Sequence, residues 1–280
     1  MATLQPKRPI LTALLLVAGL LLCTAATADR LADGIAAYEA EDYERAYELL
    51  RPLAEEGDAD AQYYVGRMYG FGRGVAKDVQ RAFDLHHDAA GIGQTNSMRV
   101  LGYTYLNGVT AEGLTIEQDH EKAAYWYRKA AEAGDAKAQR SMGLLYKRGE
   151  GVERDYAQAM EWFRRGAEQG DAVSAYHVGK LYYDGLDPIE LDYVRAAQWF
   201  HRAARAGHAH SQYILGSLHL QGLGVPGNSE LAVVWYGLAA RQGHQAATRN
   251  WERAHYFVRE DRLEAIAQRV EQGDMPALVQ

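Results

Sequence analysis

The chain has 280 residues, of which 48% are hydrophobic, and a formal net charge of −7. A chain of this length and composition can bury a large core, and nothing in its composition indicates disorder. The acidic balance argues against a general binder of nucleic acids or anionic membranes, which needs a basic surface, although a local basic patch stays open.

The N-terminus has the three-part layout of a secretory signal peptide. Lys7 and Arg8 precede an apolar run over residues 10–22, and small residues follow up to Ala28. We therefore predict a signal peptide over residues 1–28, cleaved before Asp29, and a periplasmic or secreted mature protein. A transmembrane anchor is the alternative, but the apolar run is shorter than the roughly 20 residues that a span needs.

Cys23 allows a third interpretation, a lipid-modified N-terminus. Leu20, Leu21 and Leu22 precede it, and none of them is the small residue expected there. Cys23 is also the only cysteine of the chain, so the predicted mature protein has none. Disulfides therefore cannot stabilise its fold, and the core has to do so.

From residue 31 onward the pattern is helical and repetitive. Two short amphipathic segments over residues 31–57 predict an entering helical hairpin. Five units with one helix on either side of a glycine-containing loop follow, at residues 58–93, 94–134, 135–170, 171–207 and 208–243.

An anchor glycine in each first helix sets the register, at intervals of 36, 41, 36 and 37 residues: Gly66, Gly102, Gly143, Gly179 and Gly216. A fixed period in this range is the signature of a repeat solenoid. We therefore predict an all-α fold, a right-handed α-solenoid of stacked antiparallel helical hairpins.

The start and the middle of each first helix have recurring residue types. An Asp or His follows the glycine that ends the preceding unit: Asp58, Asp135, Asp171, His208 and His244. Asp at this place predicts an N-cap. Because a mid-helix glycine costs about 1 kcal/mol relative to Ala, its repetition indicates that the anchor glycines are close helix contacts.

Each second helix carries a stripe that alternates small and large side chains. The large members are Leu85, Trp126, Trp162, Trp199 and Trp235, with an alanine three residues before each of them. Helical spacing alone explains these tryptophans as core residues, so the core interpretation is preferred over an aromatic binding cage.

These residues resemble the Sel-one-like repeat family, a branch of the tetratricopeptide-like helical solenoids. The pattern from Met142 to Val152, continued by Asp155, Ala159, Trp162 and Gly170, nearly spells the family repeat. The resemblance covers residues 58–243 as full units. A five-residue insertion after Gly108, a loop after Gly185 without its second glycine, and Leu85 in place of Trp are departures from the pattern.

The pattern decays after Gly243. Leu263, Ile266, Ala267 and Val270 then form a single apolar stripe with charged residues elsewhere. We predict a C-terminal cap over residues 244–273, because the end of a solenoid requires a polar outer face, and a tail over residues 274–280.

The sequence carries no recognisable catalytic motif. The glycine-rich run at residues 70–74 looks like a phosphate loop but follows a predicted helix and recurs as a repeat turn. His201, His208 and His210 suggest a metal site, yet His208 has a structural explanation in the repeat, and neither a cysteine nor a paired carboxylate completes a ligand set. We predict no metal, no cofactor and no enzymatic activity.

The resemblance implies a protein-interaction scaffold or regulator of the bacterial cell envelope. The alternative is an envelope enzyme that acts on cell-wall or lactam substrates with the solenoid as its scaffold. No acid/base pair in the sequence supports this alternative. The composition predicts no nucleic-acid partner, and we expect no stable membrane insertion once the signal is removed.

Helical geometry predicts a binding surface on the first helices. Positions three before, one after and four after each anchor glycine share the face opposite the apolar one. Besides Gly70, Leu106, Ser217 and Leu220, these positions hold the predicted partner-binding residues Tyr63, Arg67, Arg99, Tyr103, Arg140, Leu144, Lys147, Tyr176, Lys180, Tyr183 and Tyr213.

This set contains five tyrosines, five basic residues and no acid, although the chain is acidic as a whole. In solenoids of the kind that the chain resembles, first helices line the concave side. We therefore predict a groove for an acidic or extended peptide segment of a protein partner. The alternative is a solvated face on which these residue types gather by chance.

Overall fold

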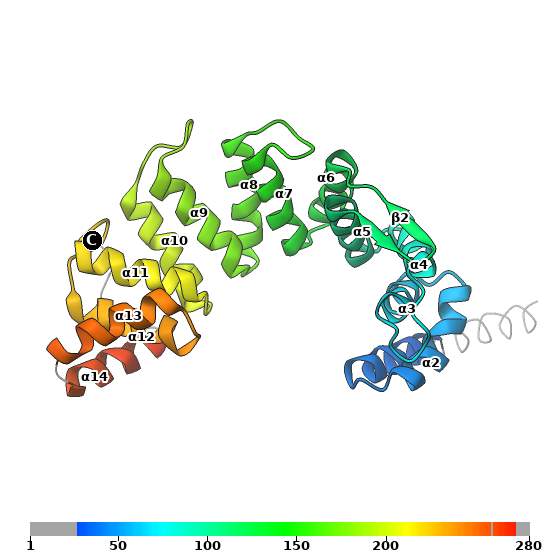
Figure 1. The fold of residues 1–280 in the computed structure, drawn as a ribbon, viewed down its shortest axis with the longest axis horizontal. Helices are drawn as coiled ribbons and strands as arrows, with labels where there is room; N and C mark the ends of the chain where they lie inside the picture. Colours follow the sequence, from blue (N-terminus) through cyan, green and yellow to red (C-terminus); the bar gives the residue numbers. More distant parts are fainter. Residues whose placement is uncertain (1–26, 259, 273–280) are drawn as a thin grey trace, which may run out of the picture. The chain divides into compact units, whose positions relative to one another are not determined.

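The computed structural model describes residues 27–258 and 260–272. Residues 1–26 of the predicted signal peptide and the predicted tail at residues 274–280 lie outside this part of the chain. The chain divides into two compact units, residues 1–119 and 120–280. Figure 1 shows the helices of each unit in chain order.

Unit 1 contains four labelled helices and two short strands, preceded by a helical stretch at residues 27–39. Their bounds are α2 Tyr43–Glu55, α3 Ala59–Phe71, α4 Val79–Gly91, α5 Thr95–Asn107, β1 Val109–Ala111 and β2 Leu114–Ile116.

Unit 2 is helical throughout the part that the structure describes. Its elements are α6 His120–Glu132, α7 Ala136–Arg148, α8 Tyr156–Glu168, α9 Ala172–Asp184, α10 Tyr193–Arg205, α11 Ala209–Gln221, α12 Ser229–Arg241, α13 Gln245–Ala254, the 3-10 turn η1 His255–Phe257 and α14 Glu260–Glu271.

Within each unit the helices pack as stacked antiparallel hairpins. The pairs α3/α4, α7/α8, α9/α10 and α11/α12 are closed hairpins, and the second helix of one hairpin packs on the first helix of the next, as α8 does on α9 and α10 on α11. This alternation confirms the predicted solenoid of helical hairpins.

The predicted N-caps are present. Asp58, Asp135 and Asp171 each accept a hydrogen bond from the backbone N–H three residues on, as in the 2.8 Å bond from Ala61 to Asp58 Oδ1. His208 and His244 do the same with ring Nδ1 at the starts of α11 and α13. Because these side chains satisfy backbone donors that have no partner inside the helix, each repeat begins its first helix at a defined residue.

The anchor glycines are close contacts, as predicted. Four of the five face the residue that follows the large side chain of the second helix: Gly66 with His86, Gly143 with Phe163, Gly179 with Phe200 and Gly216 with Tyr236. A Cβ atom at Gly143 would lie 2.6 Å from the ring of Phe163, so any side chain there would force the ring or the helices to shift. The glycine therefore meets a ring of its own hairpin.

The sequence analysis identified the tryptophans as core but missed the residue after each of them. Phe163 and Phe200 are fully buried, whereas Trp162 is 8% exposed and Trp199 is only half-buried. The guanidinium of Arg165 lies 4.8 Å from the centre of the Trp162 ring. The ring that contacts the anchor glycine is thus the second member of each aromatic pair, while Trp162 and Trp235 are buried as predicted.

Each unit has its own apolar core. In unit 1 it is built around Leu50, Val65 and Met68. In unit 2 it runs from α8 to α12 and continues into α14, where the predicted stripe of Leu263, Ile266, Ala267 and Val270 packs against it.

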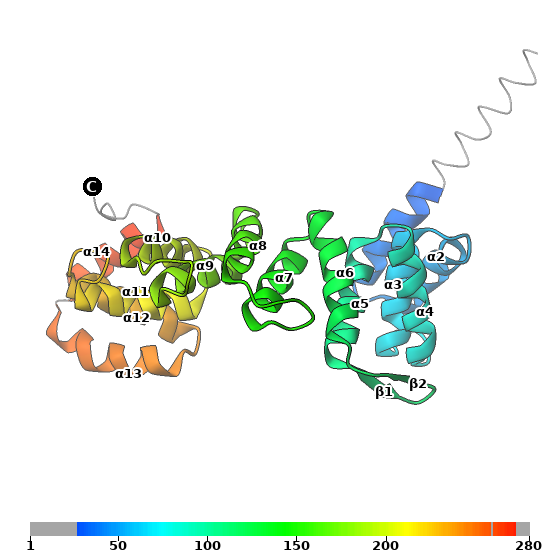
Figure 2. The ribbon, with the colours of Figure 1, turned by 90° about the horizontal axis from the view of Figure 1, so that it is seen from above.

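The insertion after Gly108 forms a small antiparallel ribbon within an otherwise helical unit. The strands β1 and β2 lie side by side (Figure 2). Val109 pairs with Ile116 and Ala111 with Leu114, and Gly113 turns the chain with φ 84°. Alternating β-branched residues on either side of a Glu-Gly turn favour such a hairpin over a loop.

None of the helices in the described part of the chain has the length and apolar character to cross a membrane.

Candidate functional site

The predicted face of unit 1 is only partly open to solvent. Tyr63 is buried, whereas Tyr103 is 64% exposed. The guanidinium of Arg67 lies over the rings of Tyr38 and Tyr63, 5.2 and 5.7 Å from their centres. Arg99 donates a 2.8 Å hydrogen bond to Asn96. Tyr103 is therefore the most accessible of the four residues predicted to bind a partner in this unit.

In unit 2 the structure places acids among the predicted basic residues. Arg140 forms a 2.7 Å ion pair with Asp171, the N-cap of α9, and Lys180 bonds to Asp184 one turn later on the same helix. Burial lowers the pKa of Lys147, while nearby Asp184 opposes the change. This face is less basic than the predicted residues alone suggest. Asp171 and Asp184 are not among those residues, but they neutralise Arg140 and Lys180.

The remaining predicted residues of unit 2 are Leu144, Tyr176, Tyr183 and Tyr213, all half-buried. Tyr183 packs edge-on against Tyr193, with Lys180 Nζ 5.5 Å from the centre of its ring. Tyr176 and Tyr213 instead meet histidines of the following repeats.

These contacts form a histidine–tyrosine cluster that the sequence analysis did not identify: Tyr176, His208, His210, Tyr213 and His244. Tyr176 lies 5.0 Å from His208 and 5.4 Å from His210 between ring centres. His244 stacks on Tyr213 at 4.8 Å and on His210 at 5.3 Å. The signal in the sequence is the histidine cap, which recurs after 36 residues and brings consecutive repeats together.

Hydrogen bonds define the proton positions in this cluster. The Nδ1 atom of His244 accepts the N–H of Ala247 at 3.2 Å, so the proton of the neutral ring is on Nε2. This Nε2–H donates to His210 Nδ1 over 3.0 Å. Burial lowers the pKa of both His208 and His210, and the charge of His244 lowers that of His210 further. His208 and His210 are therefore harder to protonate than a solvent-exposed histidine.

Other histidines lie inside the hairpins. Burial lowers the pKa of His86, His177 and His201 to about 4. His177 stacks on Phe163 at 4.6 Å, and His86 contacts Ser97 Oγ at 3.2 Å. Among the residues that the structure describes, no three His, Cys, Asp or Glu side chains are placed to hold a metal ion.

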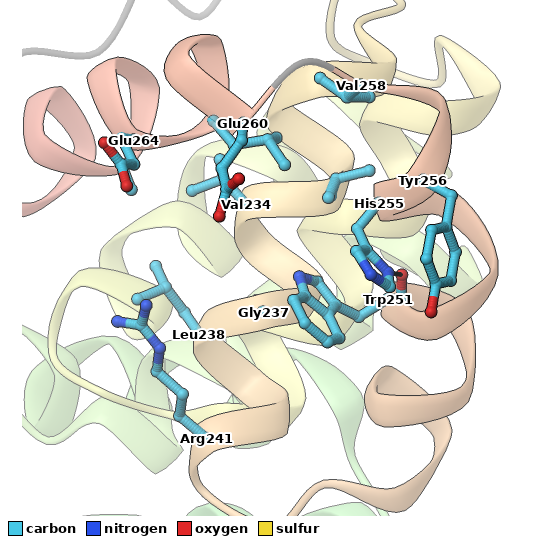
Figure 3. A pocket seen from close by; sticks show the side chains of 13 residues that line it. Val234, Gly237, Leu238, Arg241, Trp251, His255, Tyr256, Val258, Glu260 and Glu264 are labelled. Carbon is cyan, nitrogen blue, oxygen red and sulfur yellow. Dashed lines mark hydrogen bonds between the residues drawn. The ribbon is translucent and has the colours of Figure 1, made fainter.

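A second candidate site is a cavity of about 590 Å³ at the C-terminal end of unit 2, between α12, α13 and α14 (Figure 3). Val233, Val234, Gly237, Leu238, Arg241, Trp251, His255, Tyr256, Val258, Glu260, Leu263, Glu264 and Ala267 line it. The sequence predicted a C-terminal cap in this region but no cavity.

One wall of the cavity is aromatic and the opposite rim is acidic. The rings of Trp251 and His255 stack in parallel with 4.2 Å between their centres, and Tyr256 lies beside His255 and is 81% exposed. Glu260 and Glu264 are one turn apart on α14, and Figure 3 shows them across the cavity from these rings. The arrangement can hold an apolar group with a positive charge at its edge.

Comparison with known proteins places the repeats in a family. The family model described as Sel1 repeat matches the chain six times, at residues 26–58, 59–91, 95–135, 136–171, 172–208 and 209–244. The first match lies over the predicted entering hairpin.

Two solved structures share the fold over most of the chain. A Sel1 repeat protein from Oxalobacter formigenes is 28% identical, with a TM-score of 0.72 over 90% of this chain and 99% of that one. The protective antigen c5321 of uropathogenic Escherichia coli, described as having an SLR fold, is 29% identical, with a TM-score of 0.74 over 89% of this chain and 54% of that one.

Curated relatives match a shorter part. Protein sel-1 homolog 2 of Mus musculus is 31% identical over 35% of this chain and 14% of its own length. HRD3B of Arabidopsis thaliana, a component of an ERAD-associated E3 ubiquitin-protein ligase, is 29% identical over 38% of this chain and 16% of its own length. Sel1 repeat proteins generally act as scaffolds for protein–protein contacts and are typically non-enzymatic. Because the repeat model matches well over half of its residues, the chain belongs to the Sel1 repeat family.

Proposed function

We propose that the chain is a scaffold or regulator of the bacterial cell envelope that binds a segment of a partner protein on one face of its first helices. In unit 2 this first-helix face consists of Arg140, Leu144, Lys147, Tyr176, Lys180, Tyr183 and Tyr213, and in unit 1 of Tyr63, Arg67, Arg99 and Tyr103.

The observation that carries this proposal is the lateral continuity of the face in unit 2. Arg140 of α7 pairs with Asp171 at the start of α9, and Tyr176 of α9 contacts His210 of α11. Tyr213 of α11 stacks on His244 at the start of α13. Contacts between successive first helices hold these side chains in place. Binding a segment therefore costs less conformational entropy of the protein, because its interface side chains are already ordered.

The residue types favour an extended segment with acidic groups. Tyrosine and arginine concentrate binding energy at protein interfaces because they combine a large contact area with hydrogen-bonding groups. A partner carboxylate would compete with Asp171 for Arg140 and with Asp184 for Lys180. We therefore expect the rings to contribute more to affinity than the charges do.

The assignment to the envelope rests on different support. The charged, apolar and small-residue layout of residues 1–28 is typical of an export signal, and the two solved structures described above come from bacteria. No arrangement of the described residues favours the alternative of an envelope enzyme.

The test is capture of a partner from cross-linked bacterial envelopes with the full chain as bait. We expect Tyr103→Ala combined with Arg140→Gln to reduce the recovery of a specific partner at least about tenfold, which corresponds to roughly 1.4 kcal/mol of binding free energy. Tyr125→Ala with Arg165→Gln is the matched control, because both residues are exposed on second helices. Equal losses in the two variants would refute a binding role for the first-helix face.

A further inference from the structure

The last repeat of unit 2 differs from the others in how its helices pack. In the preceding hairpins the two helices close on each other, and a ring such as Phe200 or Tyr236 fills the space beside the anchor glycine. Glu252 replaces that glycine in α13. Among the described residues α13 and α14 both pack on α12, while close pairing between them is absent. The interior of this hairpin is the cavity in Figure 3.

The floor of this cavity is apolar. Val233 and Val234 of α12 are almost fully buried, and Leu238, Leu263 and Ala267 are half-buried around them. In the closed hairpins an aromatic side chain occupies the corresponding interior. Covering this apolar floor with an apolar side chain of a ligand is favourable, because it removes apolar surface from water.

The walls above the floor select for positive charge. The rings of Trp251 and His255 are stacked, and the ring of Tyr256 is tilted by 38° against that of His255. The open face of an aromatic ring attracts cations. Glu260 and Glu264 lie on the opposite rim with exposed side chains, and among the described residues neither has a hydrogen-bond or ion-pair partner. By contrast, Arg262 on the same helix is paired with Glu230. The rim thus carries two carboxylates, and Arg241 is the one arginine or lysine among the lining residues.

We propose that this cavity binds a segment of a partner protein in which a bulky apolar residue is followed by a lysine or arginine. The apolar side chain enters the floor, and the neighbouring cation lies against Tyr256 and pairs with Glu260 and Glu264. The aliphatic stem of lysine or arginine can follow the apolar edge while its charge stays at the rim. This cavity is proposed to bind basic segments, whereas the first-helix face is proposed to bind acidic ones. An experiment can therefore refute one proposal and leave the other intact.

An array of synthetic peptides about eight residues long tests the proposal. Each peptide carries one Leu, Ile or Phe followed by a variable residue, and the full chain is the probe. We expect Lys and Arg at the variable position to bind at least about tenfold better than Asp and Glu. Reversing the charge of the rim with Glu260→Lys and Glu264→Lys should invert this preference. Tyr256→Ala should weaken binding of the basic peptides. This variant should still fold, because the Tyr256 side chain is 81% exposed.

The control is Glu132→Lys with Glu168→Lys, which changes the net charge equally at exposed positions outside the cavity. We expect it to keep the basic preference. An unchanged preference in the rim variant, or an equal change in both double variants, would overturn the proposal. Two further results would overturn it: peptide binding that increases when residues 274–280 are removed, or peptide binding that decreases as the chain self-associates. In either case a segment of the chain itself would occupy the cavity.

Discussion

At the residue scale, two caps differ chemically from the others in their response to pH. Asp135 and Asp171 begin α7 and α9 with a carboxylate, whereas α11 and α13 begin with His208 and His244. A carboxylate stays ionised at pH 5, because the ordinary pKa of Asp is about 3.9. A protonated imidazole carries a hydrogen on Nδ1 and can no longer accept the backbone N–H. Its positive charge also opposes the helix dipole.

We predict that these caps make unit 2 less stable in mild acid. Burial, followed by the charge of His210, lowers the pKa of His208 in the folded protein, while Asp171 opposes the change. The stabilising contribution of His208 is therefore complete above its unfolded value of 6.5 and is lost as the pH falls through the folded value. His208→Asp with His244→Asp should reduce the loss of unfolding free energy between pH 7.5 and 5 by about 1 to 2 kcal/mol.

Urea unfolding followed by circular dichroism at the two pH values measures this difference. The reciprocal variant Asp135→His introduces an imidazole cap at α7 and should increase the acid sensitivity. Other buried histidines, such as His86 and His201, contribute equally in every variant. If the double aspartate variant and the wild type lose the same free energy, the caps do not govern the response.

Local rules account for the caps but not for the partners of charged residues. Asp after a unit-ending glycine predicted the N-caps, because the capping bond lies within three residues. The pair between Arg140 and Asp171 joins residues 31 positions apart, and only the stacking of repeats brings them together. A positional pattern within one helix therefore overestimated the positive charge of the first-helix face.

At the element scale, the contact between the two helices of a hairpin depends on the anchor glycine. A Cβ at Gly143 would meet the ring of the fully buried Phe163 at 2.6 Å. We predict that Gly143→Ala loses the helix-propensity gain of about 1 kcal/mol to this overlap. Gly143→Leu should lower the free energy of unfolding by at least about 1 to 3 kcal/mol, since larger side chains force the helices apart.

The matched control is Gly91→Ala at the end of α4, where no atom lies within 4 Å of the new Cβ. It should leave the midpoint of thermal unfolding unchanged or raise it. A Gly143→Leu protein that melts with the wild type would show that the rings do not press on the glycines in solution.

The elements also show where repeat reasoning ends. The aligned glycines predicted which helices pair, and the stripe predicted Trp162 and Trp235 as core residues, which are buried. The stripe did not predict that the ring against the glycine belongs to the next residue, such as Phe163 or Phe200. The two positions are adjacent, and helical spacing does not separate their exposure well. The strands β1 and β2 come from an insertion outside the repeat pattern. Among the described residues, the other repeats therefore have no corresponding strands.

At the scale of the whole molecule, the periodic glycines were sufficient to predict the fold class, because each repeat packs on its neighbours by the same contacts. They could not predict the cavity at the C-terminal end, since it exists where the repeat pattern fails at Glu252. The repeat period also gives little information about partner-binding residues. Packing between helices determines which residue types recur, and exposed positions are free to vary from repeat to repeat.

The central claim is that the chain recognises a partner through its first helices. Site-specific photo-crosslinking in living bacteria tests it most directly, with a photoreactive residue at Tyr103 or Leu220, which are 64% and 57% exposed on α5 and α11. The controls are Tyr125 and Val194, 52% and 41% exposed on the second helices α6 and α10. We predict that one envelope protein is cross-linked from both first-helix positions and from neither control. Cross-linking of that protein with equal yield from Tyr125 or Val194, or from no position at all, would contradict the account.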